Sequence, residues 1–314
     1  MTRVAAVDCG TNSIRLLIAD VDGDRLTDVV RRLEIVRLGQ GVDRTGRLAP
    51  AALERTRVAM RSYAADIRQA GVERVRLVAT SATRDAVNRD EFAADVRSIL
   101  GVDPEVVTGD EEAALSFDGA IGALDDRFPT PYLVLDIGGG STEFVLGDRA
   151  VEAARSVDIG CVRLTERHFT VDPPSPASVA AAVADIDGAL SVVAETVPLS
   201  RARTLIGLAG TVTTVAAIAL ELPAYDPERI HHARIAVETV REVTDRLLAM
   251  GHGERAALPV MHPGRVDVIG AGALILATVM DRLGFADMVV SEVDILDGIA
   301  LSMIDGSADA AVSI

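Results

Sequence analysis

The sequence predicts a protein of the α/β class with two domains, and three observations support that prediction. The chain has 314 residues, which is long enough for two domains that each bury a core. Hydrophobic residues make up 49% of it but aromatic residues only 3%, so Val, Leu, Ile and Ala must fill the cores, as in buried α/β sheets. Apolar strand-like segments alternate with amphipathic helical segments, which indicates a mixed or parallel sheet with helices packed on it.

The elements of the first half are delimited by local signals. We predict strands over residues 4–8, 14–20, 76–80 and 105–108 and helices over residues 50–69, 89–100 and 108–124. Pro50 suits the first turn of its helix, and Gly71 follows the end of that helix. Thr108 and Glu111 have the spacing of a capping box, which starts the last of these helices.

The second half is predicted to begin a new domain. Residues 125–131 hold two acids, one Arg and two prolines ahead of a fresh strand, so we expect one domain over residues 1–124 and the next over 125–293. Its predicted strands cover residues 132–136, 143–146, 204–208 and 288–291, and helices are predicted over 177–195, from 212 onward, over 265–283 and over 294–304.

The composition excludes several classes of protein. A formal net charge of −16 argues against a nucleic-acid surface, which needs clustered Lys and Arg. No run of about 18 charge-free apolar residues is present, and the N-terminus resembles no signal peptide, so no membrane partner is expected. Cys9 and Cys161 suggest no disulfide framework, which predicts a reduced, cytoplasmic protein. An acidic protein repels an anionic substrate at long range, so such a substrate would need a locally basic site or a divalent cation.

An internal repeat opens both halves of the chain. Residues 4–13 and residues 133–141 share the pattern of a buried strand, a glycine turn and a second strand. The corresponding pairs are Asp8 with Asp136, Gly10 with Gly138 and Ser13 with Ser141. Two copies of one unit predict two related domains that face each other across a cleft.

Glycine turns of this kind suit phosphate binding. Without a Cβ atom, backbone N–H groups can approach phosphate oxygens, and hydroxyl groups add donors. An Asp at the end of the preceding strand can hold a metal ion. Either turn alone can equally be an ordinary hairpin. A dinucleotide-binding motif is excluded because a strand, and not a helix, follows residues 136–141.

Several charged residues are candidates for catalysis or phosphate binding. Glu111 and Glu112 begin a helix, where acids either complement the helix dipole or act as a general base on water. Arg84 follows a strand, where ligand sites of α/β sheets gather, although a solvated Arg is an equal alternative. Arg15 and Arg265 follow turns and are singled out only because of the predicted cleft.

The remaining ionisable candidates are given structural roles. His231 and His232 are adjacent, and adjacent residues on a strand or helix point apart, so a metal site is not expected there. Cys9 is expected to be a small buried residue at the end of a strand.

At this point the sequence resembles the exopolyphosphatase / guanosine pentaphosphate phosphohydrolase family. The resemblance is carried, in order, by residues 8–16 (DCGTNSIRL), 79–88 (ATSATRDAVN), 109–113 (GDEEA), 136–143 (DIGGGSTE), 159–163 (IGCVR) and 208–211 (LAGT). It spans nearly the whole chain. It implies two ribonuclease-H-like domains of the actin, sugar-kinase and heat-shock-chaperone ATPase superfamily, with the last helix, within residues 294–314, returning to the first domain.

The resemblance also implies roles for individual residues. Glu112 falls at the catalytic base, Glu143 at the residue that positions the water and the metal, and Arg84 at a phosphate-binding arginine. Arg15 and Arg265 match positions that face substrate phosphates or guanosine. The residues that bind phosphate would then be Gly10, Thr11, Asn12, Ser13, Gly138, Gly139, Gly140, Ser141, Thr142, Gly210 and Thr211. The residues that bind the metal would be Asp8, Asp136 and Glu143.

The implied reaction removes a terminal phosphate from inorganic polyphosphate or guanosine pentaphosphate. The implied cofactor is Mg²⁺ or Mn²⁺, the implied assembly is a homodimer, and the implied context is the stringent response. Ala114 departs from the Arg or Lys of many members. The helical C-terminal region of longer members does not follow, which suggests a preference for short chains.

Two alternatives of other kinds stay open. An ATPase or small-molecule kinase of the same fold would need an adenosine pocket around Gly210 and Thr211. A non-catalytic sensor of guanosine polyphosphates would bind the same ligand without releasing phosphate.

Overall fold

The chain folds into two compact units. The computed structural model describes residues 2–23, 25–122, 124, 127–304 and 312–313. Unit 1 comprises Met1–Ala123 and Asp294–Ile314, and unit 2 comprises Leu124–Val293. The boundary at 123/124 lies one residue from the predicted one. The last helix belongs to unit 1, as the resemblance implied.

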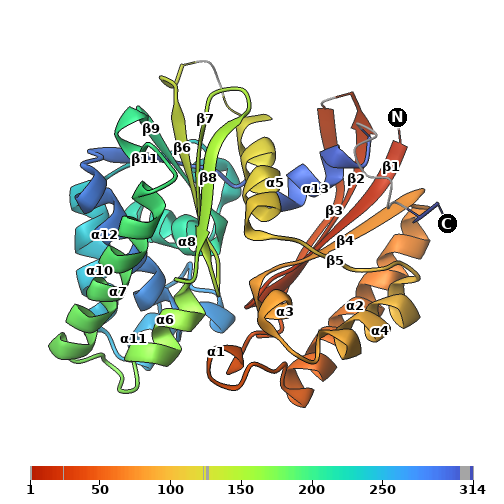
Figure 1. The fold of residues 1–314 in the computed structure, drawn as a ribbon, viewed down its shortest axis with the longest axis horizontal. Helices are drawn as coiled ribbons and strands as arrows, with labels where there is room; N and C mark the ends of the chain where they lie inside the picture. Colours follow the sequence, from red (N-terminus) through yellow and green to blue (C-terminus); the bar gives the residue numbers. More distant parts are fainter. Residues whose placement is uncertain (1, 24, 123, 125–126, 305–311, 314) are drawn as a thin grey trace. The chain divides into compact units, whose positions relative to one another are not determined.

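The sheet of unit 1 has the order β12-β4-β1-β2-β3, with β5 beside β4 (Figure 1). Its strands are β1 (Thr2–Cys9), β2 (Ser13–Asp22), β3 (Arg25–Ile35), β4 (Arg74–Ala79), β5 (Glu105–Val106) and β12 (Val312–Ser313). Strands β1, β2 and β3 form an antiparallel meander, whereas β4 lies parallel to β1 and β5 lies parallel to β4. The carboxyl ends of β1, β4 and β5 therefore meet at one edge of the sheet.

The sheet of unit 2 repeats this topology in the order β10-β11-β9-β6-β7-β8. Its strands are β6 (Tyr132–Ile137), β7 (Thr142–Gly147), β8 (Val151–Val157), β9 (Thr204–Leu208), β10 (Arg234–Ala236) and β11 (Asp287–Val290). The hairpin β6–β7 corresponds to β1–β2, β9 corresponds to β4, and β11 corresponds to β5. The α/β class and the two related domains predicted from the internal repeat are thus confirmed.

The sequence pattern does not predict strands β3 and β8. Both lie at an edge of their sheet, and most of their residues are partly or fully exposed. Because charged residues occupy much of such an edge strand, the alternation of apolar and polar residues that marks a strand is weak there.

Helices cover both sheets. Unit 1 contains α1 (Val42–Thr45), α2 (Pro50–Ala70), α3 (Ser81–Asp85), α4 (Arg89–Leu100), α5 (Gly109–Gly122) and α13 (Ile295–Ser302). Unit 2 contains α6 (Cys161–His168), α7 (Pro176–Ala194), α8 (Ala209–Ala219), α9 (Pro227–Ile230), α10 (Val237–Ala249), α11 (His252–Ala256) and α12 (Ile269–Leu283), with short 3₁₀ turns at Leu199–Arg201 and Pro263–Arg265.

The local signals that predicted helix ends act as expected in most places. Pro50 occupies the first turn of α2, and Gly71 ends it in the left-handed conformation with φ 65°. The helix predicted to start at Arg265 starts instead at Ile269, because Pro263–Arg265 forms a separate 3₁₀ turn. The ring of His262 holds that turn by accepting a hydrogen bond from the N–H group of Gly264 at 3.1 Å.

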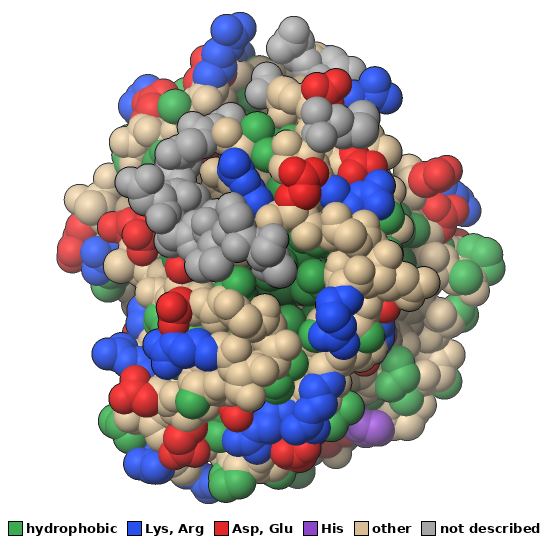
Figure 2. Space-filling model, turned by 90° about the vertical axis from the view of Figure 1, so that its right-hand side faces the viewer, with side chains coloured by type: hydrophobic (Ala, Val, Ile, Leu, Met, Phe, Trp, Pro, Cys, Tyr) green, Lys and Arg blue, Asp and Glu red, His purple; other side chains and the backbone are tan. Residues whose placement is uncertain are grey.

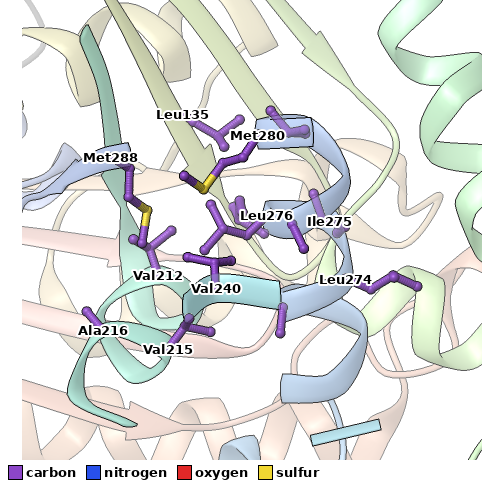
Figure 3. Packing of buried hydrophobic residues seen from close by; sticks show 14 of the residues in the cluster. Leu135, Val212, Val215, Ala216, Val240, Leu274, Ile275, Leu276, Met280 and Met288 are labelled. Carbon is purple, nitrogen blue, oxygen red and sulfur yellow. The ribbon is translucent and has the colours of Figure 1, made fainter. Parts of the chain in front are cut away.

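Aliphatic side chains form the cores, as the composition predicts. In unit 2, Figure 3 shows side chains from α8, α10 and α12 converging on those of the sheet. They include Leu135, Val212, Val215, Val240, Leu276, Met280 and Met288. In unit 1, α2 and α4 cover one face of the sheet through residues such as Met60 and Phe92, and α13 covers the other through Ile299. Burial of both faces explains why β1 reads as a continuous apolar run.

Helix α7 is long and apolar enough, by length and composition alone, to cross a membrane. It nevertheless carries two acids, and Asp187 accepts hydrogen bonds from Arg282 of α12 at 2.7 and 2.9 Å. The side chains of Ile186 and Leu190 are buried in the core of unit 2. In this structure α7 is therefore one of the helices that pack on the domain core.

All cationic side chains of the protein are arginines, because the sequence contains no Lys. Figure 2 shows Arg side chains mixed with Asp and Glu side chains over one face of the molecule. Many arginines of the protein form ion pairs, for example Arg57 with Asp95 at 2.8 Å. Basic side chains on this face therefore do not form a separate positive field.

Two glycines allow α5 and α13 to cross at very short distance. A Cβ atom on Gly119 would lie 2.0 Å from the carbonyl oxygen of Asp294, and one on Gly298 would lie 2.0 Å from the carbonyl oxygen of Leu115. Both obstacles are backbone atoms, which cannot rotate away as a side chain can. The contact between the two helices therefore requires glycine at both positions.

We expect Gly298→Ala to lower the free energy of unfolding by about 1–3 kcal/mol or more, because the helices must separate to admit the methyl group. The measurement is urea denaturation. The control is Gly188→Ala in α7, where an added Cβ meets nothing within 4 Å. That change should raise stability by about 0.5–1 kcal/mol through the better helix propensity of Ala. Equal stability of both variants would show that the crossing tolerates a Cβ atom.

Candidate active site

The first glycine turn, residues 10–13, joins β1 to β2 in unit 1. The N–H group of Gly10 donates to the carbonyl oxygen of Ser13 at 2.9 Å. The carbonyl oxygen of Thr11 accepts the N–H group of Gly39 at 2.8 Å, and that of Asn12 accepts the N–H group of Arg37 at 2.8 Å. The turn thus directs its carbonyl groups onto the segment that follows β3, which fixes the turn and orients its peptides.

The second glycine turn, residues 138–141, joins β6 to β7 in unit 2 with the same geometry. The N–H group of Gly138 donates to the carbonyl oxygen of Ser141 at 3.1 Å. The carbonyl oxygen of Gly138 accepts the N–H group of Cys161 at 3.0 Å, and that of Gly139 accepts N–H groups at the start of α6 at 2.9 and 3.1 Å. The hydroxyl group of Thr142 donates to the carbonyl oxygen of Ile159 at 2.6 Å.

This arrangement leaves amide groups of the second turn available to a ligand. Among the residues that the structure describes, the N–H groups of Gly139 and Gly140 have no acceptor. Gly160 lies so close to their peptide that a Cβ atom on it would be 2.4 Å from the carbonyl oxygen of Gly139. The motif at residues 159–163 therefore packs against the carbonyl oxygens of the turn, and the N–H groups of the turn can bind an anion.

The two copies of the repeat differ in one charge. The strand register places Arg15 opposite Asp8 in unit 1 and Glu143 opposite Asp136 in unit 2. Residues directly opposite each other in neighbouring strands have Cβ atoms about 4.5–5.5 Å apart. The first turn therefore has an acid paired with a base, whereas the second has two acids side by side.

In unit 1, Arg15 connects two buried carboxylates. Its Nε and Nη2 atoms donate to Asp8 at 2.9 and 2.7 Å, and its Nη1 atom donates to Asp294, which caps α13. Burial raises the pKa of Asp8, and the charge of Arg15 opposes that rise. The structure thus places Arg15 between Asp8 and Asp294, and its contact with substrate phosphates stays a prediction.

In unit 2, Asp136 and Glu143 are the best candidates for holding a divalent cation. Their side chains are buried, and Glu143 accepts a hydrogen bond from the hydroxyl group of Ser156 at 2.7 Å. The described part of the chain contains no cluster of three or more His, Cys, Asp or Glu residues that could bind a metal. Two carboxylates nevertheless suit Mg²⁺, which keeps several of its waters and takes few protein ligands. Asp8 fits less well, because Arg15 already binds its carboxylate.

The two adjacent acids at the start of α5 have different roles in the structure. Glu111 accepts hydrogen bonds from the N–H and hydroxyl groups of Thr108 at 2.8 and 2.9 Å, which lowers its pKa and completes the predicted capping box. Glu112 is only 8% exposed, and its Oε2 atom accepts a hydrogen bond from Nη1 of Arg84 at 3.2 Å. The structural role that the sequence left open belongs to Glu111, and Glu112 lies next to Arg84.

Arg84 is linked to the first glycine turn through α3. The hydroxyl groups of Thr11 in the turn and Ser81 in α3 lie 2.9 Å apart. Arg84, also in α3, donates to the carbonyl oxygen of Val107 at 2.9 Å as well as to Glu112. A continuous set of contacts within unit 1 therefore runs from the first turn to Arg84, the predicted phosphate-binding arginine, and to Glu112, the predicted base.

Arg265 covers Gly210 in unit 2. A Cβ atom on Gly210 would lie 2.2 Å from Nη2 of Arg265, and Nη1 of Arg265 donates to the hydroxyl group of Thr214 at 3.1 Å. Ala209 before it has φ 66°, a left-handed conformation that is strained for a residue with a side chain. Thr211 is packed against Gly272, where an added Cβ atom would meet its side chain at 2.6 Å.

This packing bears on the alternative of an ATPase or kinase. A nucleoside lying against Gly210 would have to displace the guanidinium group that already covers it. The guanidinium group of Arg265 thus occupies the place beside Gly210 where this alternative puts an adenosine. The predicted contacts of Gly210, Thr211 and Arg265 with substrate stay predictions.

The expectation that His231 and His232 point apart is wrong. Their rings stack with centroids 3.7 Å apart, and Phe128 packs against His232 edge to face. His232 has φ 62°, so the chain there is neither strand nor helix and the rule for those elements does not apply. Cys9 and Cys161 are buried, which raises the pKa of both thiols, so neither is a reactive thiolate.

Sequence reasoning missed Asp294, Ser81 and Ser156 as members of these networks. Asp294 caps α13 just beyond the end of strand β11, a position where ligand sites of α/β sheets gather. That rule could have singled it out. Ser81 carries the same signal, because it follows the end of β4. Ser156 carries no such signal, because only the fold brings it to Glu143.

Comparison with known proteins identifies the family of the chain. The sequence pattern of the Ppx/GppA phosphatase family matches residues 17–306 of this chain. Exopolyphosphatase 2 of Mycobacterium tuberculosis is 52% identical, over 96% of this chain and 99% of that protein. The crystal structure of an exopolyphosphatase-like protein superimposes with a TM-score of 0.93 at 44% identity, covering 98% of this chain and 99% of the other. The guanosine-5'-triphosphate,3'-diphosphate pyrophosphatase of Aeromonas salmonicida is 28% identical over 97% of this chain and 60% of that protein.

Proposed function

Because the chain belongs to the Ppx/GppA phosphatase family, we propose that it is an exopolyphosphatase that removes the terminal phosphate of inorganic polyphosphate as orthophosphate. The observation that carries this proposal is the pair of Arg84 and Glu112 in unit 1, joined at 3.2 Å and linked through Ser81 to a glycine turn. A buried carboxylate beside an arginine and a phosphate-binding turn is what hydrolysis of a phosphoanhydride requires.

The reaction needs positioning and charge neutralisation more than covalent chemistry. In unit 1, the turn at residues 10–13 contacts oxygens of the terminal phosphate, and Arg84 offsets their negative charge. In unit 2, the N–H groups of Gly139 and Gly140 suit phosphate oxygens. Glu112 accepts a proton from a water molecule as that water attacks phosphorus. The new P–O bond forms in line with the bridging oxygen, whose bond to phosphorus breaks, so orthophosphate and a chain shorter by one phosphate result.

Asp136 and Glu143 would hold Mg²⁺ or Mn²⁺. When bound, such an ion supplies positive charge to the non-bridging phosphate oxygens. This role also answers the problem posed by the net charge of −16, because a polyanion that carries a divalent cation is repelled less by an acidic protein. Burial of two acids side by side supports the assignment, since a cation between them relieves their repulsion.

Guanosine pentaphosphate is the second substrate that we propose. It ends in the same phosphoanhydride group, and a relative named for that chemistry matches 97% of this chain. Such an activity would connect the protein with the stringent response. We also propose that the protein is located in the cytoplasm and forms a homodimer.

A phosphate-release panel tests the proposed function. We expect orthophosphate release from inorganic polyphosphates and from guanosine pentaphosphate without any added ADP or ATP. Removal of Mg²⁺ with EDTA should reduce each rate at least tenfold, and adding Mg²⁺ or Mn²⁺ back should restore it. Polyphosphates of increasing length in the same panel test the expected preference for short chains.

The panel also separates the alternatives. Release that depends on ADP, or on a small acceptor molecule together with ATP, would indicate a kinase or ATPase. Tight binding of guanosine pentaphosphate without release of phosphate from any substrate would indicate a sensor. Either result would overturn the exopolyphosphatase assignment.

A further inference from the structure

The hydroxyl group of Ser156, in strand β8 of unit 2, contacts the acid pair beside the second glycine turn. It donates to Oε1 of Glu143 at 2.7 Å. Strand β8 lies beside β7 at the edge of the sheet (Figure 1). The strand register places Asp136 opposite Glu143, and Glu143 opposite Ser156. Because residues directly opposite each other point to the same face of a sheet, these three side chains form one row, which we call the acid row.

The internal repeat shows how the acid row differs from its counterpart. The equivalent row of unit 1 consists of Asp8, Arg15 and Leu33. Its middle residue is a base that donates its own hydrogen bonds, to Asp8 and to Asp294, and its third residue has no hydrogen-bonding side chain. In unit 2 the middle residue is an acid, which only accepts hydrogen bonds when it is ionised. A hydroxyl donor, Ser156, therefore lies in the third position of the row whose middle residue needs one.

Burial makes this donor important for the acid row. Glu143 is 1% exposed and Asp136 is 7% exposed. The cross-strand neighbour of Asp136 on its other side is Leu208 of β9, whose side chain has no donor. Ser156 therefore offers the acid pair a hydrogen bond that this neighbour does not. Two buried acids side by side repel each other when ionised, so their positions depend on the groups that hold them.

A hydrogen bond to one oxygen restricts the rotation of a carboxylate group. Ser156 binds Oε1 of Glu143, so the orientation of this carboxylate is restricted before any ion binds. A ligand that is held in this way loses less conformational freedom when it binds a metal. Residues that hydrogen-bond to metal ligands orient those ligands, and losing them typically costs about 10- to 100-fold in metal affinity.

We propose that Ser156 is a positioning residue for the divalent-cation site, which orients the Glu143 carboxylate through this hydrogen bond without touching the ion. The inference rests on the proposed function, in which Asp136 and Glu143 hold Mg²⁺ or Mn²⁺. It gives Ser156 a role in metal binding and none in the attack of water on phosphorus.

A purely structural role for Ser156 makes a different prediction. If the hydroxyl group only satisfies a buried acceptor, its removal lowers the stability of the metal-free protein and leaves the affinity for a metal unchanged. If the hydroxyl group positions Glu143, its removal weakens metal binding. Metal affinity and metal-free stability are therefore measured on the same variants.

The test is a calorimetric titration of Mn²⁺ into the whole chain without substrate. We expect Ser156→Ala to weaken Mn²⁺ binding about 10- to 100-fold. Ser156→Thr keeps the hydroxyl group and suits a strand, so it should bind Mn²⁺ nearly as well as the wild type. Glu143→Gln removes the charge of the ligand and should weaken binding at least as much as Ser156→Ala. The matched control is Thr27→Ala, which removes a hydroxyl group from an exposed position in β3, the edge strand of unit 1, and should not change binding.

The metal dependence of phosphate release gives a second readout. With tripolyphosphate as substrate, the Mg²⁺ concentration for half-maximal rate should rise about 10- to 100-fold in Ser156→Ala. Excess Mg²⁺ should then recover most of the rate, because mass action compensates for weaker binding. Thermal unfolding in EDTA measures the metal-free stability of each variant. A lower stability of Ser156→Ala with an unchanged Mn²⁺ affinity would show a structural role only and would overturn the proposal.

Metal binding without substrate separates this inference from the proposed function. If Mn²⁺ binding weakens as expected but the wild type releases no phosphate from any substrate, the proposed function fails and the positioning role stands. If the wild type releases phosphate while Ser156→Ala binds Mn²⁺ as well as the wild type does, the positioning role fails alone. It also fails if Ser156→Thr loses as much affinity as Ser156→Ala, or if the wild type binds Mn²⁺ no better than Glu143→Gln.

Discussion

Replacing Glu112 by glutamine should reduce kcat for phosphate release by about 10²-fold or more, the usual scale for loss of a general base. Glutamine cannot take a proton from the attacking water, yet its amide oxygen can still accept the hydrogen bond from Arg84. The fold should therefore persist, with the thermal midpoint close to that of the wild type. The measurement is orthophosphate release from tripolyphosphate under saturating substrate, with thermal unfolding of the same sample.

The adjacent residue provides the control for this experiment. Glu111→Gln changes an acid of the same type in the same helical turn, and glutamine also completes a capping box with Thr108. It should leave kcat within about twofold of the wild type, since a capping contact makes no part of the transition state. Near-normal turnover in Glu112→Gln, or equal losses in both variants, would remove Glu112 from the role of base.

Arg15→Met should lower the free energy of unfolding by about 3–5 kcal/mol, because it leaves two buried carboxylates without their common partner. Asp8 and Asp294 are 4% and 5% exposed, so water cannot replace the guanidinium group. Urea denaturation at neutral pH measures the effect. The control is Arg97→Met, which breaks an ion pair with Asp103 whose side chains are 59% and 73% exposed, and which should change stability by less than about 1 kcal/mol.

The pH dependence of this loss identifies its cause. Burial raises the pKa of Asp8 above its value in the unfolded chain, so ionising Asp8 destabilises the fold as the pH rises through the folded-state pKa. Arg15 opposes this by favouring the charged form. Without Arg15 the difference from the wild type should shrink as the pH falls, because Asp8 then becomes protonated. Adding Asp294→Asn to Arg15→Met should recover part of the lost stability. If Arg15→Met destabilises the protein no more than Arg97→Met does, this explanation is wrong.

The parts of the fold that the sequence predicts depend on contacts within a few residues. The positions of Pro50 and Gly71 mark α2, and Thr108 with Glu111 marks α5 through hydrogen bonds three residues apart. The repeat around Asp8 and Asp136 predicts the duplicated topology, since identical local patterns form identical hairpins. Edge strand β3 is not predicted, because its residues are partly or fully exposed and the alternation of apolar and polar residues is weak there.

The candidate site is predictable only as a set of residues, and its internal contacts are not. The sequence gives Glu111 the spacing of a capping box and Glu112 only a resemblance to a catalytic base. Successive residues of a helix point about 100° apart, so Glu111 reaches Thr108 and Glu112 reaches Arg84. Arg15 and Glu143 occupy equivalent places in the two repeats. Only the structure shows that one is paired with Asp8 and that the other faces Asp136.

By itself the sequence determined the class of the fold, its duplication and the residue types available for phosphate chemistry, because turns, caps and apolar periodicity act over short distances along the chain. The tertiary structure decided which charges are paired and which remain for a ligand. Asp294 reaches Arg15 across 279 positions of sequence, and Arg265 reaches Gly210 from another loop. Such pairings depend on how distant segments pack, so no local pattern encodes them.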